Sequence, residues 1–433
     1  MKPTSRRVIA DLKELKALTS DERGAQRVAW GPVWRTARQW FEAKLRDELG
    51  IRCERDGAGN LWATLPGARP ESLVIGSHID SVPGGGWLDG CLGVVAGIEV
   101  LRRAQARGTP PVTLHLVDWA DEEGARFGRS LTGSAASAGT LDARRELSHL
   151  VDRSGVKLPD ALKENGIALE GMATAHRYFL GKKPAAYLEL HIEQGPVLKE
   201  MKRPCAVVLG TMGVERHLLR FVGQAAHSGA APIHLRQDAF LAAAEFALAC
   251  RDISVQHSGR SPRTRVVATC GVVKVEPNFV TAVPGLTEIS IDLRALDKQV
   301  LKTMLREAKQ ASARAARKHT VTVKWSPLLH ITPRPFDETL MGFVGAAIRD
   351  VTGRKAAAIP SGPLHDASEM AAVVPTAMLF AQSSPGVSHT RIEDTPRAAL
   401  DASIRAFLIA VDRTLDHLHQ QAAAAMGTPD SEP

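Results

Sequence analysis

Three short clusters of acidic residues and histidine in the first third of the chain carry the side chains best suited to chemistry. They are Gly76-Ser77-His78-Ile79-Asp80, Leu88-Asp89-Gly90 and Asp121-Glu122-Glu123-Gly124. Each follows or lies near an apolar, β-branched run, which predicts a position at the end of a strand, where the ligand sites of open α/β sheets collect. Histidine and carboxylate groups that converge there can hold a divalent metal, and a remaining glutamate can act as a base. The pattern favours a hydrolase with two metal ions.

The spacing within the first two clusters suggests separate roles. His78 and Asp80 share one face if the segment is still extended, so His78 can bind a metal while Asp80 accepts the other ring N–H. Asp89 lies in a glycine-rich turn, from which its carboxylate can bridge two ions.

Glu122 and Glu123 are adjacent, so one can bind metal while the other accepts a proton from water that the metal acidifies. His191, on the polar face of an expected strand, and His389, between an expected strand and a helix, are candidates to complete the site. Each motif alone is compatible with a buried, hydrogen-bonded histidine or a helix-capping acid. Three motifs in order after successive strands favour a metal site.

The elements around these residues predict a discontinuous α/β domain. Strands at 72–79, 111–119 and 185–192 and a helix at 90–107 give a βαβ rhythm, which is typical of a mainly parallel sheet. The character changes near residue 210, with alternating strands and long helices typical of an α+β insertion; the strands are 214–222, 265–275 and 287–294, and the helices 235–257 and 297–318. The α/β character returns with a helix at 338–351, a strand at 376–380 and a helix at 396–417. We therefore expect a catalytic domain of residues 1–211 and 329–420, a lid of residues 212–328 and a disordered tail of residues 421–433.

Composition restricts the class of protein. The 433 residues are 44% hydrophobic and 24% charged, with a formal charge of +8, as in a soluble globular protein of more than one domain. The basic residues along 298–317 fit a solvated helix face better than a nucleic-acid site. Five cysteines without a CxxC motif, no apolar leader and no apolar stretch of membrane-spanning length predict a cytoplasmic protein with no membrane or nucleic-acid partner.

The motifs resemble those of the M20-type metallohydrolases, and more narrowly the hydantoinase/carbamoylase branch, which includes N-carbamoyl-L-amino-acid hydrolases and allantoate amidohydrolases. The run Leu190-His191-Ile192-Glu193-Gln194-Gly195-Pro196 is the most specific signature of that branch. Further matches are the three clusters above, Ala226-His227-Ser228-Gly229, Pro277-Asn278, Val283-Pro284-Gly285, Asp292-Leu293-Arg294, Ser361-Gly362, His365-Asp366-Ala367 and Ser388-His389.

The resemblance implies a zinc-aminopeptidase-like catalytic domain with an inserted α+β lid through which a homodimer forms. It also implies two divalent ions per subunit, of zinc, manganese, cobalt or nickel. Asp89 would bridge them, with His78 and His191 on one ion and Glu123 and His389 on the other. Glu122 would be the general base. His227 would polarise the scissile carbonyl, and the substrate would be bound by Gln194, Asn278, Arg294 and His365.

The implied reaction is hydrolysis of the ureido C–N bond of an N-carbamoyl-L-amino acid to the amino acid, carbon dioxide and ammonia. Arg294 would hold the substrate carboxylate, since the fork of its guanidinium suits bidentate binding. Allantoate or another ureide is an alternative substrate, and an N-acyl-amino-acid amidase or peptidase is a second alternative. The bulky Trp87 and Leu364 depart from the usual pattern of the branch near the expected pocket. A catalytically inactive binding protein is disfavoured by the complete set of expected ligands.

Overall fold

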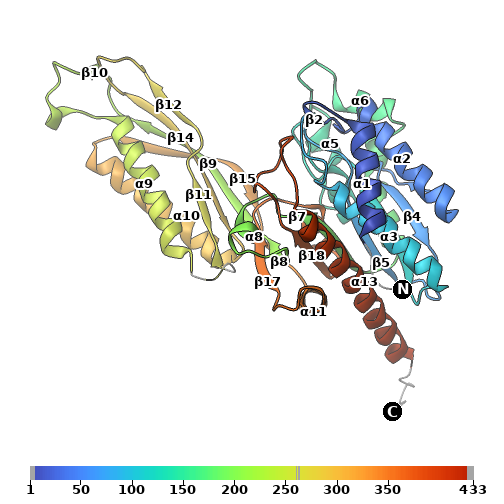
Figure 1. The fold of residues 1–433 in the computed structure, drawn as a ribbon. Helices are drawn as coiled ribbons and strands as arrows, with labels where there is room; N and C mark the ends of the chain where they lie inside the picture. Colours follow the sequence, from blue (N-terminus) through green and yellow to red (C-terminus); the bar gives the residue numbers. More distant parts are fainter. Residues whose placement is uncertain (1–4, 260, 262–263, 427–433) are drawn as a thin grey trace, which may run out of the picture. The chain divides into compact units, whose positions relative to one another are not determined.

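The computed structural model describes residues 5–259, 261 and 264–426, with side chains up to residue 421 (Figure 1). The chain divides into two compact units, of which the second interrupts the first. The first unit comprises Met1–Leu209, Phe336–Ile359 and Leu364–Pro433, and the second comprises Gly210–Pro335 and Pro360–Pro363. The strand β15 of the second unit continues to Ile331, beyond residue 328, where we expected the lid to end.

A mixed sheet with a parallel centre forms the middle of the first unit. The central order is β18-β7-β5-β6, all parallel, and antiparallel strands flank it, with β8 beside β18 and β4 then β3 beyond β6. This confirms the predicted α/β class. The strands are β3 (Glu54–Arg55), β4 (Leu61–Leu65), β5 (Ser72–His78), β6 (Thr113–Trp119), β7 (Pro184–Ile192), β8 (Cys205–Thr211), β17 (Ala357–Ser361) and β18 (Thr376–Ala381).

Helices surround this sheet, and α3 packs closely against it. Gly93 and Gly97 make this approach possible, because a Cβ on Gly93 would lie 2.4 Å from the carbonyl oxygen of Leu190 and one on Gly97 would lie 2.2 Å from a methyl of Leu116. The helices are α1 (Arg6–Thr19), α2 (Pro32–Leu49), α3 (Cys91–Arg107), α4 (Thr132–Ala138), α5 (Ala143–Leu147), α6 (Leu158–Glu164), α7 (Thr174–Gly181), α8 (Val197–Glu200), α11 (Glu338–Thr352), α12 (Asp366–Met370) and α13 (Arg397–Met426).

The second unit is an α+β structure in which two long helices pack on an antiparallel sheet. The sheet order is β11-β14-β9-β15, and β12 also pairs with β14. The helices α9 and α10 share one apolar core with the sheet residues Leu219, Phe221, Ile289, Ile291 and Leu293. The elements are β9 (Gly213–Val222), β10 (Ala226–His227), α9 (Ala239–His257), β11 (Val267–Thr269), β12 (Val273–Glu276), β13 (Ala282–Val283), β14 (Leu286–Ala295), α10 (Lys298–Lys318), β15 (Thr322–Ile331) and β16 (Arg334–Pro335).

Several element boundaries differ from expectation for local reasons. The helix α9 begins at Ala239 and not at 235, because the Asp238 carboxylate caps it by accepting hydrogen bonds from the N–H groups of Phe240 and Leu241. The helix α13 runs to Met426, into the expected tail, and its alanine-rich end favours helix. The rest of that expected tail, residues 427–433, lies outside the described residues.

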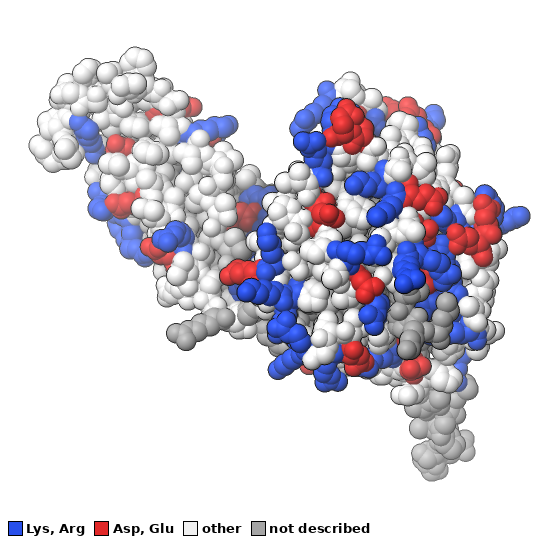
Figure 2. Space-filling model, in the orientation of Figure 1, with Lys and Arg blue, Asp and Glu red and all other residues white. Residues whose placement is uncertain are grey.

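The charged surface shows both signs interspersed (Figure 2). The basic residues of α10 lie on its solvated side, as expected, since Lys298, Lys302 and Lys309 are exposed while Leu301 and Met304 are buried. No helix within the described part of the chain is long and apolar enough to cross a membrane.

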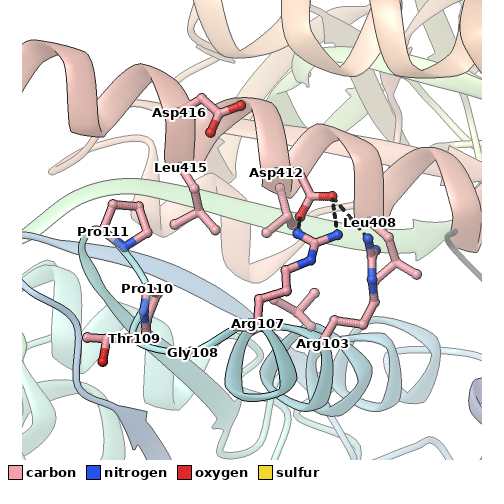
Figure 3. Close-up of a pocket in the computed structure, with 13 residues that line it drawn as sticks. Arg103, Arg107, Gly108, Thr109, Pro110, Pro111, Leu408, Asp412, Leu415 and Asp416 are labelled. Atoms are coloured by element: carbon pink, nitrogen blue, oxygen red, sulfur yellow. Dashed lines mark hydrogen bonds and ion pairs between the residues drawn. The ribbon is translucent and has the colours of Figure 1, made fainter. Parts of the chain in front are cut away.

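A cavity of about 360 Å³ lies between α3 and α13 (Figure 3). Arg103 and Arg107 of α3 line it and both bind Asp412 of α13. This cavity lies at the C-terminal end of α3, whereas Asp89 precedes the N-terminal end, so it is not the candidate site described next.

Candidate metal centre

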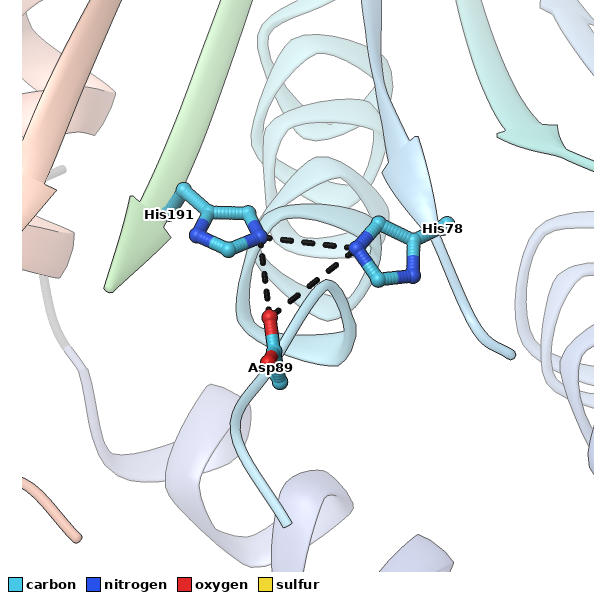
Figure 4. Close-up of side chains that lie close together, drawn as sticks. All are labelled: His78, Asp89 and His191. Atoms are coloured by element: carbon cyan, nitrogen blue, oxygen red, sulfur yellow. Dashed lines mark hydrogen bonds and ion pairs between the residues drawn. The ribbon is translucent and has the colours of Figure 1, made fainter. Parts of the chain in front are cut away.

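His78 and His191 lie at the carboxyl ends of the neighbouring parallel strands β5 and β7, and both are fully buried. The Nδ1 atom of His78 lies 3.1 Å from the carbonyl oxygen of Asp80, and that of His191 lies 2.9 Å from the carbonyl oxygen of Ile192. Because a carbonyl oxygen only accepts, Nδ1 is the donor in both rings. The two Nε2 atoms therefore carry lone pairs, and they lie 3.5 Å apart (Figure 4).

Asp89 completes this group from the turn before α3. Its Oδ1 lies 3.2 Å from Nε2 of His191 and 4.0 Å from Nε2 of His78, and this buried oxygen has no hydrogen-bond partner among the described residues. The N–H of Gly90 also points at Nε2 of His191, at 3.3 Å. Nε2 of His78 and Oδ1 of Asp89 thus converge here without a hydrogen-bond donor, which is unfavourable unless a cation satisfies them. The residues therefore fit a metal ion.

The electrostatics of this group also favour a positive charge. Burial alone lowers the pKa of a histidine, and it brings the pKa of His78 to about 3. For His191 the Asp89 carboxylate outweighs burial and raises the pKa to about 9. A proton and a metal ion would compete for Nε2 of His191.

A second group of candidate ligands lies beside the other carboxylate oxygen of Asp89. The Nε2 atom of His389 lies 3.7 Å from Oδ2 of Asp89 and 3.2 Å from Oε2 of Glu123. The hydrogen bond to Glu123 raises the pKa of His389 to about 9, and burial raises the pKa of Glu123. The His389 side chain is 50% exposed, so this group is the more accessible one. Asp89 therefore joins two groups of candidate ligands, each through a different oxygen.

Glu122 lies beside the first group. Its side chain is buried, and its Oε2 lies 3.7 Å from Nε2 of His78. Burial, and then the neighbouring carboxylates of Asp366 and Glu123, raise the pKa of Glu122 well above its usual value. A carboxyl group with a raised pKa can both accept and donate a proton near neutral pH.

The contact between His78 and Asp80 differs from the expected one. The ring N–H of His78 is accepted by the backbone carbonyl of Asp80, while the nearest carboxylate oxygen lies 3.6 Å away. The strand β5 ends at His78, so the alternation that would place both side chains on one face does not continue. The Asp80 carboxylate instead accepts the N–H groups of Glu122 at 3.2 Å and Glu123 at 3.1 Å, which orients that turn.

Two of the predicted substrate-binding residues contact the candidate metal ligands directly. The side-chain amide nitrogen of Gln194, Nε2, lies 2.9 Å from Oδ2 of Asp89. His365 is buried and its ring centroid lies 4.4 Å from that of His191. His365, His191 and Glu189 form a third cluster of potential ligand atoms.

The other three predicted residues belong to the second unit. His227 is exposed in β10, and its Nδ1 accepts the N–H of Gly229 at 3.1 Å. Asn278 is exposed and has a φ of 50°. Arg294 in β14 donates to both carboxylate oxygens of Asp292 and, through Nη1, to the carbonyl oxygen of Gly362 at 3.0 Å.

Sequence reasoning missed two residues that hold Asp89. The Ser388 hydroxyl lies 3.0 Å from Oδ2 of Asp89 and is also within hydrogen-bond distance of the Glu393 carboxyl group. Glu393 is buried and accepts the N–H of Asp89 at 3.3 Å, and burial and Asp89 raise its pKa to about 7. Ser388 could have been suggested by its position next to His389, but Glu393 stands in a loop without any motif.

Comparisons with known proteins place the chain in a family. Residues 74–413 match the model of peptidase family M20/M25/M40. The chain is 33% identical over 378 residues to an N-carbamoyl-L-amino acid amidohydrolase of Geobacillus stearothermophilus, covering 86% of this chain and 88% of that protein. It is 29% identical over 377 residues to the allantoate amidohydrolase of Bacillus subtilis (strain 168), covering 85% and 89%. The crystal structure of a hydantoinase/carbamoylase family amidase from Burkholderia multivorans matches with a TM-score of 0.85 and 29% identity, covering 94% of this chain and 97% of that one.

Proposed function

The chain belongs to peptidase family M20/M25/M40, and we propose that it is a metal-dependent hydrolase that cleaves the ureido C–N bond of N-carbamoyl-L-amino acids. The products would be the amino acid, carbon dioxide and ammonia. The relatives named above support an amidohydrolase of the carbamoylase or allantoate type.

One observation carries this proposal, namely that the two oxygens of Asp89 face two separate groups of candidate ligands. We infer that one divalent ion is held by His78, His191 and Asp89, and a second by Asp89, Glu123 and His389. Histidine and carboxylate ligands without a thiolate suit zinc, manganese, cobalt or nickel. Such ions, when bound, polarise a carbonyl oxygen and lower the pKa of water.

Glu122 would then act as general base toward the attacking water and afterwards as acid toward the leaving nitrogen. Its burial and raised pKa suit both steps, since one carboxyl group must gain the proton and release it within a turnover. Asp80 fixes the turn that carries it through two backbone hydrogen bonds.

The second unit would supply the groups that recognise the substrate. His227 would donate a hydrogen bond to the developing oxyanion, and Arg294 would bind the substrate carboxylate. Of the five N–H donors of Arg294, the structure shows three in use, on Asp292 and Gly362, which leaves donors for a ligand. Asn278, Gln194 and His365 would complete the recognition.

We propose that two copies of the chain associate through the second unit. Its surface exposes several large apolar side chains, with Val280 96%, Ile233 82%, Phe279 69% and Leu235 68% exposed. Exposed large apolar side chains are found at interaction surfaces. Sedimentation velocity of the wild type and of a Phe279→Ser, Val280→Ser variant tests this proposal, and a monomeric wild type would contradict it.

Allantoate is the second candidate substrate, since an allantoate amidohydrolase matches the chain over nearly the same length as the carbamoyl amino acid hydrolase. Ammonia release by the metal-loaded protein from N-carbamoyl-L-methionine and from allantoate decides between the two. Ammonia release from the carbamoyl amino acid supports the proposal. Release from allantoate alone would show that the substrate is a ureide instead.

A further inference from the structure

Arg27 is a fully buried cation that binds main-chain carbonyl groups and forms no ion pair within 4.0 Å in the described part of the chain. Its Nε donates to the carbonyl oxygen of Ile79 at 2.7 Å, and its Nη2 lies 3.5 Å from the carbonyl oxygen of Gly86. Its Nη1 donates to the hydroxyl of Thr19 at 3.3 Å. A charged side chain is buried in this way only where several of its donors are satisfied.

The two carbonyl groups belong to the two segments that carry the proposed ligands of the first ion. Ile79 directly follows His78 in the chain, and Gly86 lies three residues before Asp89. One guanidinium therefore links the end of β5 to the turn before α3. The planar fork of arginine can hold two carbonyl groups at a fixed separation, which an ammonium group cannot do.

The backbone around Arg27 strengthens this link. The N–H of Arg27 donates to the Ser81 hydroxyl and its carbonyl oxygen accepts the N–H of Ser81, both at 3.1 Å. Ala25 makes a second reciprocal pair, with the carbonyl of Gly85 and the N–H of Gly84, both at 2.9 Å. Residues 25–27 thus contact the loop that joins His78 to Asp89 at several points between Ile79 and Gly86.

Glu393 contacts the same loop. A Cβ on Gly86 would lie 1.9 Å from Oε1 of Glu393, and that oxygen accepts the N–H of Asp89. The Gly86 backbone thus contacts both Arg27 and Glu393.

We propose that Arg27 is a positioning residue for the metal centre, which holds the His78 and Asp89 segments at the separation that the first ion requires. This inference rests on the proposed metal site. Arg27 does not contact the ion, so its effect is expected in metal affinity, where residues that orient ligands typically contribute 10- to 100-fold.

The test is calorimetric titration of Mn²⁺ into metal-free wild type, Arg27→Met and Arg27→Lys. Arg102→Met is the matched control, because Arg102 is also buried but pairs with Asp11 and Glu48 away from the ligands. We expect Arg27→Met to bind about 10- to 100-fold more weakly, Arg27→Lys to recover part of the affinity, and Arg102→Met to melt at a lower temperature with unchanged affinity.

Wild-type affinity in Arg27→Met, or an equal loss in Arg102→Met, would overturn the inference. If Arg27→Met does not fold, Arg27→Lys and Ser81→Ala decide, since both weaken the same link, and wild-type affinity in both would overturn it. Absence of Mn²⁺ binding by the wild type would instead contradict the metal centre itself.

Discussion

The Oε2 atom of Glu122 lies 3.7 Å from the Nε2 atom of His78, and both side chains are buried at the carboxyl end of the central sheet. A carboxyl group is thus held beside the ring nitrogen that faces the first candidate metal position. Glu122 is close enough to exchange protons with a molecule at that position without being needed as a ligand. The neighbouring Glu123 contacts His389 in the second group.

This arrangement predicts opposite behaviour for the two adjacent glutamates. Glu122→Gln should retain metal and lose turnover by at least the roughly 10²- to 10⁴-fold that general base catalysis contributes. Glu123→Gln is the matched control and should lose metal, because it removes a ligand charge. Ammonia release and metal content by atomic emission, measured on both variants, check this. Unchanged turnover in Glu122→Gln would show that another group is the base.

The shared carboxylate predicts how metal content responds to substitution. His389→Ala should retain the ion held by His78 and His191 and lose the other, since only the second group contains His389. Asp89→Ala should lose both, because its two oxygens face both groups. Metal content after gel filtration distinguishes the two variants. Equal stoichiometry in both would contradict a bridging role for Asp89.

Metal removal should destabilise the first unit. Nε2 of His78 and the buried Oδ1 of Asp89 have no hydrogen-bond donor without a cation. A ligand present at 100 times its Kd stabilises the folded state by about 2.7 kcal/mol. Thermal melting with EDTA and with added Zn²⁺ or Mn²⁺ measures the effect, and His389→Ala serves as a control that should show a smaller shift. Identical melting curves with and without metal would contradict the site.

Arg294→Ala should damage substrate binding and leave metal content unchanged. Leaving a substrate carboxylate without its partner costs roughly 3–5 kcal/mol in a dry site. This cost should appear as a lower kcat/KM. Arg216→Ala is a useful control, because Arg216 binds the same Asp292 carboxylate but is not proposed to meet the substrate. A loss of kcat/KM below about tenfold, or about 1.4 kcal/mol, would show that Arg294 is not the anchor.

Local periodicity predicted most of the catalytic unit but not all of the second one. The apolar runs before His78 and His191 identify β5 and β7 because strands buried on both faces read as nearly continuous apolar segments. The strand β15 escaped prediction, since Pro327 interrupts it and the pairing with β9 shifts register between Pro327 and Leu329. The expected strand at 265–275 is two strands, β11 and β12, which both pair with β14.

The candidate ligands could be predicted because their types and order along the chain are distinctive. The residues that hold them could not, since the contacts join segments far apart in sequence. Glu393 accepts the N–H of Asp89 across 304 positions, and Arg27 reaches Ile79 across 52. No local pattern marks a side chain whose partners are backbone groups of a distant loop.

Reconstitution of the metal-free protein tests the central claim most directly. Ammonia release from N-carbamoyl-L-methionine is measured as Mn²⁺ is added in known equivalents to EDTA-stripped protein. The Asp89-bridged site predicts no activity without metal and a maximum at two equivalents per subunit. Full activity in the stripped protein, or saturation at one equivalent, would contradict a two-ion centre built on Asp89.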